Sequence, residues 1–517
     1  MGITDTIVFV LYGVVIFVIG NWMSKSKGKE TSSDDYFFAN KTLPWYLVGS
    51  SIIAANISAE QFIGMSGSGY AIGLAIATYE WIAALMLIVV AKYFLPVFIQ
   101  NKIFTMPQFL ALRYDNRIKT ILAIFWLMLF VFVNLSSILY LGALTLKSVF
   151  GISMVYGIIG LAVFSLLYTI VNGLKAIAST DIVQVFFLLV GGLATTYLAV
   201  NTVGGDTGVF NGFQAMFEQI PDKFHMIIKK SDPNFKYLPG IRAIIGGIWI
   251  AGIYYFGANQ YIIQKAFGAK SLKEAQKGML FAGYLKLILP FVVVIPGMVA
   301  LTLNADIAKP DEAYPWLLEH IVPSGIKGLI FAALIAAIVS SFSAIINSAS
   351  TIFTMDLYKP FFNNLASEKR LVSVGRISSV VAVFLSVLVA ASLGNLEQAF
   401  QFIQEYTGMV SPGITAIFVF GMYWKKTTSS AAFWGTILSI PISAGIKYFF
   451  FTMPFLDQML VSFFIISAII IVISLLGRKK VAKGLVLPKG IFKTEKSFNV
   501  LSLVIMLILG AIYILFW

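Results

Sequence analysis

The chain has 517 residues and a formal net charge of +14, with 59% hydrophobic, 15% aromatic and only 12% charged residues. So few charged residues cannot cover a soluble surface, and the composition therefore excludes an ordinary soluble protein. The absence of cysteine excludes disulfides and thiolate metal sites, and both histidines fall in hydrophilic loops, so we expect no imidazole chemistry at membrane depth.

Apolar segments of about 20 residues or more recur along the whole chain, and each is long enough to cross ~30 Å of hydrocarbon as a helix. The sequence therefore predicts an all-α membrane protein with about fourteen transmembrane helices. We expect them at residues 5–23, 44–73, 77–100, 118–146, 152–172, 178–202, 241–264, 277–303, 328–356, 372–393, 397–423, 428–450, 457–477 and 498–517.

Lysine and arginine are distributed unevenly between alternate loops of this topology. Most lie in the loops on one side, which include Lys25, Lys27, Lys29 and Lys41 after the first span. Because positively charged loops stay in the cytoplasm, we expect a protein of the cell (inner) membrane with both termini outside. The basic charge is thus explained by topology, and no nucleic acid partner is expected.

The second span is interrupted by the stretch AANISAEQFIGMSGSGYAIG, residues 54–73. At 1.5 Å per residue, Asn56, Ser58, Glu60 and Gln61 fall near the midplane of the bilayer. Polar side chains and closely spaced glycines at that depth favour a helix that unwinds and exposes backbone carbonyls to a cation. The alternative is a continuous helix that packs closely through its glycines, with Glu60 hydrogen-bonded to a neighbour.

The seventh span is weakened in a similar way, by four glycines and a polar pair. Five helices separate the starts of the second and seventh spans, so the two begin on opposite sides and predict an inverted repeat. We expect a first helix and inner loop (1–43), repeat 1 with helices 2–6 (44–202), an external loop (203–240), repeat 2 with helices 7–11 (241–423) and three peripheral helices (424–517).

Five charged residues lie well inside predicted spans, at Glu60, Glu80, Asp181, Lys286 and Glu405. A charge at mid-depth costs at least ~2.5 to 3.5 kcal/mol on insertion scales, so residues of this kind usually have a function. No nucleophile–base pair or metal cluster is evident, and we therefore do not expect an enzyme.

The ninth span contains AAIVSSFSAIINSAS, residues 336–350, in which Ala337, Ser340 and Ser341 share one helix face. Hydroxyl and carbonyl oxygens are ligands that a small hard cation such as Na⁺ accepts without a carboxylate. The alternative is that these serines bond back to their own backbone or pack against a neighbouring helix.

The chain resembles the sodium/solute symporter family, and within it the sodium/glucose and bacterial sodium/galactose symporters. The resemblance runs nearly end to end and is seen in SAEQFIGMSGSGYAIGLAIATYEW, TDIVQVFF, NQYIIQ, FIQEYTGMVSPG and AAIVSSFSAIINSASTIFTMDLYK. It implies a LeuT-like core of two inverted five-helix repeats, with one helix before and three after. It also implies a sodium-coupled importer of a monosaccharide that works by alternating access.

Particular residues take on roles through this resemblance. Sodium would be bound by carbonyls of Ala54, Ile57 and Ala337 and the hydroxyls of Ser340 and Ser341, with Asp181 near the sodium exit. The sugar site would use Asn56, Gln61, Glu80, Lys286 and Gln404, with Tyr255 stacking on the sugar as inner gate, and Met65 and Phe400 closing the outer side. For Glu80 and Lys286, a purely structural buried ion pair is the alternative.

Three positions depart from the galactose pattern: Ala83 replaces a serine, Gly252 an asparagine and Phe256 a tryptophan. The loss of two polar sugar contacts can change the preferred sugar. Other solutes therefore stay open, namely an inositol, an amino sugar, a carboxylate or an amino acid, as does a sensor that binds sugar without transporting it. Because Ala344 stands where a second sodium site would need a hydroxyl, we predict one ion.

Overall fold

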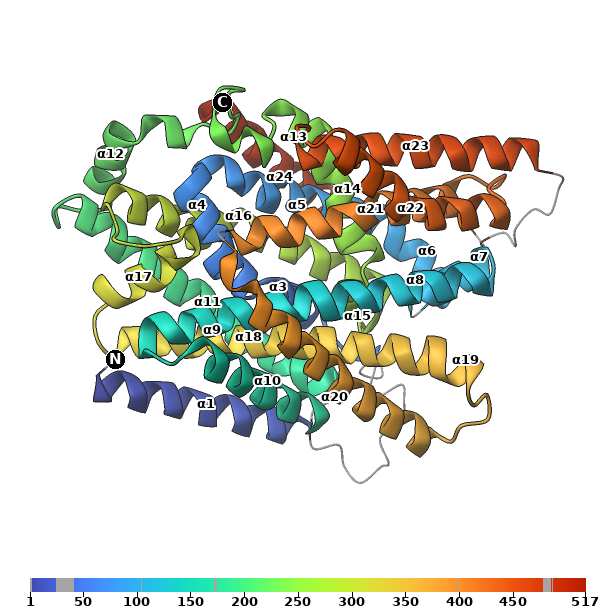
Figure 1. Cartoon of the computed structure of the whole chain (residues 1–517), viewed down its shortest axis with the longest axis horizontal. Coiled ribbons are helices and arrows are strands. Elements are labelled where there is room, and N and C mark those ends of the chain that lie inside the picture. The colour runs from blue at the N-terminus through green and yellow to red at the C-terminus, as the bar shows by residue number, and fades with distance from the viewer. Residues whose placement is uncertain are drawn as a thin grey trace.

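The computed structural model describes residues 2–24, 41–103, 105–171, 174–396, 398–477, 485 and 487–517. This part of the chain is almost entirely helical, and most of the long helices run along the horizontal axis of Figure 1. The pairing of Leu43 with Ala269 is an isolated β-bridge.

Nine helices of the described residues are long and apolar enough to cross a membrane, and one bent pair, Pro233–Ile245 with Gly247–Ala258, adds a tenth candidate. Each of the fourteen predicted spans falls on a helix or a run of helices. The protein is therefore a multi-pass helical membrane protein, as predicted. The exact number of crossings stays a prediction.

The first half of the chain consists of one leading helix, five longer helical runs, several of which contain a π-helical turn, and the short helix α7. Its elements are α1 (Ile3–Ser24), α3 (Trp45–Asn56), η2 (Glu60–Met65), α4 (Ser66–Ile72), η3 (Leu74–Ala77), α5 (Thr78–Val89), η4 (Val90–Phe94), α6 (Leu95–Gln100), α7 (Met106–Arg113), α8 (Asn116–Leu129), η5 (Phe130–Leu135), α9 (Ser136–Phe150), α10 (Met154–Val171) and α11 (Leu174–Val203).

The second half follows a connection made of α12 (Val209–Gln219), η6 (Pro221–Phe224) and η7 (Pro233–Lys236). It contains α13 (Ile241–Ile245), α14 (Gly247–Ile253), η8 (Tyr254–Ala258), α15 (Gln260–Phe267), α16 (Leu272–Thr302), η9 (Pro310–Glu312), α17 (Ala313–His320), α18 (Ile326–Thr351), η10 (Ile352–Tyr358), α19 (Lys359–Phe361), α20 (Glu368–Ser392), η11 (Leu393–Asn395) and α21 (Ala399–Tyr423). The final helices are α22 (Ser429–Phe449), α23 (Phe455–Leu476) and α24 (Lys496–Leu515).

The second span is broken where the sequence predicts it. Helix α3 ends at Asn56, Ile57 adopts an extended backbone (φ −76°, ψ 97°), and the next helical segment begins at Glu60. The seventh span breaks in the same way, because Asn259 is extended (φ −86°, ψ 121°) between η8 and α15. The continuous-helix alternative for the second span is therefore wrong.

The glycines of this stretch also allow close helix packing. A Cβ added to Gly69 of α4 would lie 2.6 Å from the carbonyl oxygen of Val294 in α16, and one on Gly297 would lie 1.9 Å from the carbonyl oxygen of Ser66. No side chain fits at either position unless the backbones separate. Thus the part of the second span that follows the break is packed against α16 through glycines.

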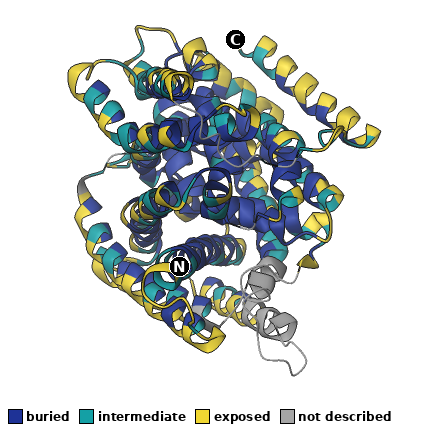
Figure 2. Ribbon diagram, turned by 90° about the vertical axis from the view of Figure 1, so that its right-hand side faces the viewer, coloured by how far each residue is buried: buried dark blue, intermediate teal, exposed yellow. Residues whose placement is uncertain are grey.

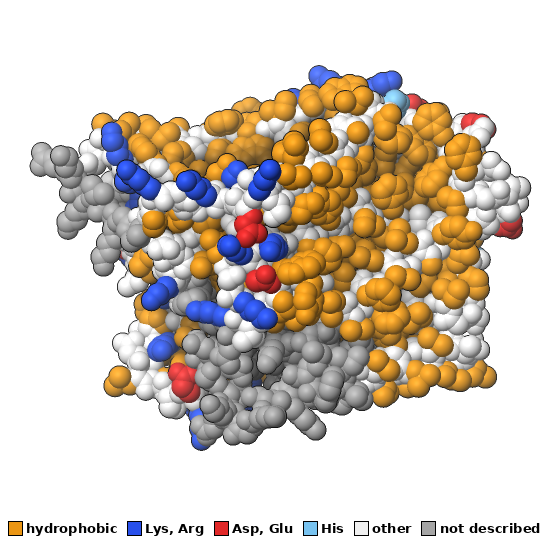
Figure 3. All heavy atoms as spheres, turned by 180° about the vertical axis from the view of Figure 1, so that it is seen from behind, with side chains coloured by type: hydrophobic (Ala, Val, Ile, Leu, Met, Phe, Trp, Pro, Cys, Tyr) orange, Lys and Arg blue, Asp and Glu red, His pale blue; other side chains and the backbone are white. Residues whose placement is uncertain are grey.

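The most buried helices form the centre of the molecule, surrounded by helices with exposed faces (Figure 2). Helix α18 is buried over almost its whole length, and its first turn is capped from α1, where Asp5 accepts from the backbone N–H groups of Gly325 (2.6 Å) and Gly328 (3.1 Å). On the face shown in Figure 3, lysine and arginine gather toward one end, while hydrophobic side chains cover much of the remainder. In a membrane protein, apolar side chains face the lipid, and basic side chains lie in the loops outside the hydrocarbon region.

Candidate functional site

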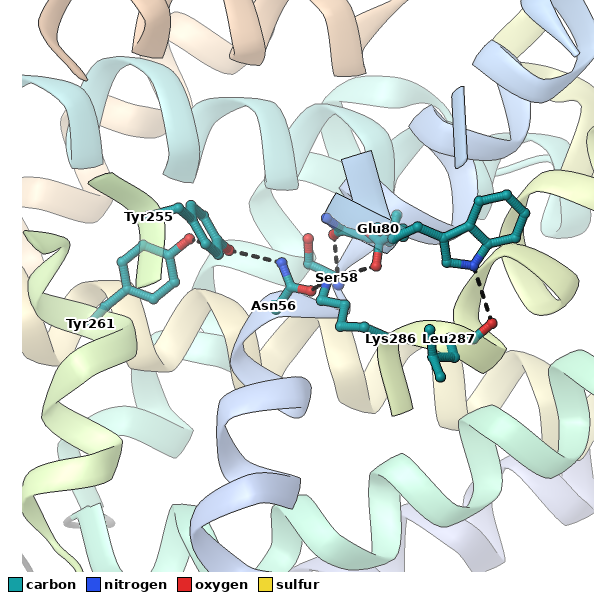
Figure 4. Close-up of polar contacts among 9 residues, drawn as sticks. Asn56, Ser58, Glu80, Tyr255, Tyr261, Lys286 and Leu287 are labelled. Carbon is teal, nitrogen blue, oxygen red and sulfur yellow. Dashed lines mark hydrogen bonds and ion pairs between the residues drawn. The ribbon is translucent and has the colours of Figure 1, made fainter. Parts of the chain in front are cut away.

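The break in α3 places Asn56 in a chain of polar contacts at the centre of the molecule. Its side-chain amide donates to the hydroxyl of Tyr255 (3.0 Å), and that hydroxyl in turn accepts from Tyr261 (2.6 Å). Figure 4 shows the three side chains in line, with Asn56 at the end of α3 and both tyrosines on the seventh span. The predicted inner-gate residue Tyr255 therefore connects the two broken helices directly.

Glu80 and Lys286 form a buried ion pair, with the ammonium 2.5 Å from the carboxylate. The same ammonium donates to the side-chain oxygen of Asn56 (Figure 4). Glu80 comes from α5, Lys286 from α16 and Asn56 from α3, so three helices contribute to one charged cluster. Next to it, the indole of Trp81 donates to the carbonyl of Leu287 (3.3 Å), which fixes α5 against α16.

A cavity opens onto this cluster. The six predicted substrate-binding residues all line it: Asn56, Gln61, Glu80, Tyr255, Lys286 and Gln404. Amide, carboxylate, ammonium and phenol groups thus surround the same space as several aromatic rings. Such a lining suits a ligand with many hydroxyl groups and an apolar ring face.

The two predicted outer-gate residues are both buried. Phe400 lines the cavity, and its ring meets that of Tyr79 edge-on at a centroid distance of 5.2 Å. A Cβ added to Gly64 would lie 3.1 Å from the Cβ of Phe400, so the broken helix and the first turn of α21 are in contact here. Met65 is fully buried next to Gly64 but does not line the cavity.

The three residues that depart from the galactose pattern also line the cavity. Ala83 and Gly252 contribute no polar group, and the ring of Phe256 lies 5.8 Å from the ammonium of Lys286. A Cβ on Gly252 would lie 2.5 Å from the Cγ of Met86. Met86 therefore fills the space where a side chain at position 252 would begin.

Three of the five oxygens of the predicted sodium site lie together at the break in α3. The hydroxyl of Ser341 lies 3.0 Å from the carbonyl oxygen of Ala54 and 3.4 Å from that of Ile57. Ser340 is its neighbour on α18, and Ala337 lies one turn earlier on the same buried helix. No group of three or more acidic, histidine or cysteine residues that could hold a metal ion occurs in the described part of the chain. The donor set is neutral oxygen, which fits an alkali cation.

Asp181 lies next to these oxygens and is fully buried. One carboxylate oxygen accepts from the hydroxyl of Ser340 (2.5 Å), and the other accepts from Ser51 (2.5 Å) and from the ammonium of Lys265 (3.3 Å). Ser343 is also buried on α18, and its hydroxyl has no hydrogen-bond partner within the described residues.

Several residues at the site were not predicted from the sequence. The cavity is also lined by Tyr79, Asn134, Tyr254, Asn259 and Thr407. Glu60, which the sequence marks as a charged residue at mid-depth without a role, lines it as well. An asparagine inside an apolar span was a visible signal for Asn134, whereas the tyrosines resemble ordinary core residues. Glu405, in contrast, pairs with Lys447 (2.7 Å) where both side chains are partly exposed.

The model of the sodium:solute symporter family matches residues 36–439. The chain belongs to this family. Over 99% of its length it is 49% identical to the sodium/glucose cotransporter of Vibrio parahaemolyticus, of which it covers 98%. It is also 34% identical to the sodium/myo-inositol cotransporter 2 of Oryctolagus cuniculus (84% of this chain, 68% of the relative) and 31% identical to the sodium/glucose cotransporter 1 of Mus musculus (85% and 70%).

Solved structures show that this family member has the LeuT-like fold. A Na⁺-coupled sialic acid symporter, solved in a substrate-bound outward-open state, superposes with a TM-score of 0.81 at 24% identity, covering 94% of this chain and all of its own. The nucleobase-cation-symport-1 family transporter Mhp1 gives a TM-score of 0.56 at 13% identity, over 85% of this chain and 94% of its own. These likenesses establish the architecture, as predicted.

Proposed function

We propose that the protein is a sodium-coupled symporter that imports a monosaccharide by alternating access across the cell inner membrane, with both termini outside. It is thus a transporter and not an enzyme. The proposal rests above all on one observation: a single break in α3 supplies carbonyls of Ala54 and Ile57 to the Ser341 hydroxyl, and Asn56 to the cavity. The relative at 49% identity, named a sodium/glucose cotransporter, supports it.

Sodium would bind to carbonyls of Ala54, Ile57 and Ala337 together with the hydroxyls of Ser340 and Ser341. Ser341 already lies within hydrogen-bond distance of two of these carbonyls. An ion between α3 and α18 would replace these contacts with ion–oxygen contacts and fix the ends of α3. Since Asn56 is the last residue of α3, the ion would also order the sugar site.

The sugar would meet Asn56, Gln61, Gln404 and the Glu80–Lys286 pair through its hydroxyls. Tyr255 would cover its apolar face and, by releasing Asn56 and Tyr261, open the inner side. Met65 and Phe400 would close the outer side. Because ion and sugar stabilise the same arrangement, each should tighten binding of the other by typically about 1 to 3 kcal/mol.

A cyclic polyol such as myo-inositol is the second candidate substrate. Ala83 and Gly252 leave the cavity without two polar groups, and Met86 occupies the space beside Gly252. A hydroxyl ring with a different pattern of contacts can therefore be preferred. The sodium/myo-inositol cotransporter 2 at 34% identity supports this candidate within the same mechanism.

A thermal stability assay on the purified protein tests this proposal. Glucose, galactose, myo-inositol, glucosamine, a monocarboxylate and an amino acid are each added in sodium chloride and in choline chloride. We expect stabilisation by a sugar or by inositol, and only with sodium. Stabilisation by the monocarboxylate or amino acid alone, or equal stabilisation in choline, would refute the assignment.

A further inference from the structure

A buried charged cluster lies beside the predicted sodium oxygens. The predicted roles of these oxygens do not explain why the cluster contains a lysine. It is formed by Asp181 of α11, Lys265 of α15, Ser51 of α3 and Ser340 of α18. Both charged side chains are almost completely buried, at 0% exposure for Asp181 and 2% for Lys265. A buried charge needs a partner, and here the lysine supplies it at 3.3 Å.

The cluster is directly connected to the ion site through Ser340, which is a predicted sodium ligand. The hydroxyl of Ser340 donates to Asp181, so the carboxylate determines how this hydroxyl is oriented. Ser51 precedes Ala54 by three residues on α3, which places the cluster about 4.5 Å further toward the start of that helix. The charge distribution predicts that the start of α3 faces the cytoplasm.

An ion that leaves the site in this direction passes a buried carboxylate. In a medium of low dielectric constant, such a carboxylate would hold Na⁺ strongly and slow its departure. Lys265 changes this situation, because its ammonium already lies against Asp181. A lysine tethered to α15 is a competitor that cannot diffuse away, and α15 begins at the break in the seventh span.

We propose that Lys265 is a positioning residue of the transport cycle: its ammonium holds Asp181 toward Ser340 and competes with Na⁺ for the carboxylate, so that the ion is released. This inference rests on the proposed function. It differs from a structural ion pair, which would affect folding and all transport modes equally.

Two transport modes in proteoliposomes separate these possibilities. Net uptake into sodium-free vesicles requires sodium release, whereas sugar exchange with equal high sodium on both sides does not. For Lys265→Met we expect net uptake to be about tenfold lower and exchange to stay within about twofold of wild type. We also expect internal sodium to inhibit net uptake at about a tenfold lower concentration than in wild type. Lys265→Arg keeps the charge and should behave like wild type.

Lys447→Met is the matched control, because Lys447 forms a partly exposed ion pair with Glu405 away from the cluster. It should change none of the three readouts. Where Lys265→Met gives no folded protein, Lys265→Gln is used with the same readouts, and sodium-dependent thermal stabilisation should report tighter sodium binding. An equal fall in net uptake and exchange, or unchanged inhibition by internal sodium, would overturn the inference. A wild-type protein without sodium-dependent exchange would instead overturn the proposed function.

Discussion

At the scale of single residues, the hydroxyl of Ser341 joins the two parts of the proposed ion site. It belongs to α18, yet it contacts two carbonyls at the end of α3. We predict that Ser341→Ala raises the sodium concentration for half-maximal thermal stabilisation by about tenfold, because one of five oxygens is lost.

Ser343→Ala serves as the control for this variant. Ser343 is buried on the same helix, and its hydroxyl has no partner within the described residues. Its removal should leave the sodium dependence unchanged, which also checks the prediction of a single ion. Equal effects of the two substitutions would contradict the assignment of Ser341.

The Glu80–Lys286 pair allows the sugar role to be separated from a structural one. Glu80→Gln should lower the free energy of unfolding by about 3 to 5 kcal/mol, because Lys286 would stay buried without its carboxylate. The double variant Glu80→Gln with Lys286→Met should regain most of this stability. We predict that sugar still fails to stabilise the double variant in a thermal assay, and retained sugar binding would favour the structural alternative.

The sequence predicts the residues whose signal is local. Asn56 and Glu80 are polar residues in apolar spans, and the hydroxyl run around Ser341 is visible on one helix face. Lys265 carries no such signal. A lysine near the end of a predicted transmembrane helix is normally interpreted as one of the positive charges that set the orientation in the membrane. Its contact with Asp181 joins residues 84 positions apart, and only the packing of the helices brings them together.

At the scale of helices, the breaks are predictable and the π-helical turns are not. Polar residues and glycines mark the break after Asn56, because an unwound helix needs groups that satisfy its backbone. The π-helical segment η5 in the fourth span contains one polar residue, Asn134, and no glycine, so the sequence does not mark the change of helix type. Its position depends on the packing of neighbouring helices, which the sequence pattern does not contain.

The segment η9 provides a prediction about pH. Asp311 packs against Gly67 and accepts from the backbone N–H of Ala399 (2.8 Å), and burial raises its pKa from 3.8 to about 8. Between these two values the folded protein retains a proton that the unfolded chain has lost, so the contribution of Asp311 to stability falls as the pH rises.

Asp311→Asn is neutral at every pH and keeps an acceptor for Ala399. We therefore predict that it raises the melting temperature at pH 8 by a few degrees and leaves it nearly unchanged at pH 4, measured by thermal unfolding in detergent. The same shift at both pH values would show that the carboxyl does not titrate in this range.

At the scale of the whole molecule, the fold follows from composition, span lengths and the two weakened helices. A chain with 59% hydrophobic residues must satisfy its backbone within helices, and the second and seventh spans break where polar residues weaken them. The overall fold matches that of a solved Na⁺-coupled symporter with a TM-score of 0.81. The orientation in the membrane stays a prediction from the loop charges. The choice of substrate depends on a few cavity residues, such as Ala83 and Gly252, which the overall fold does not determine.

Radiolabelled sugar uptake into proteoliposomes, driven by an inward sodium gradient, tests the central claim most directly. We predict that glucose, galactose or myo-inositol accumulates above its external concentration, that an inside-negative potential increases uptake, and that Ser341→Ala needs more sodium for the same rate. Uptake that is equally fast with choline in place of sodium, or that stops at the external concentration, would contradict the account.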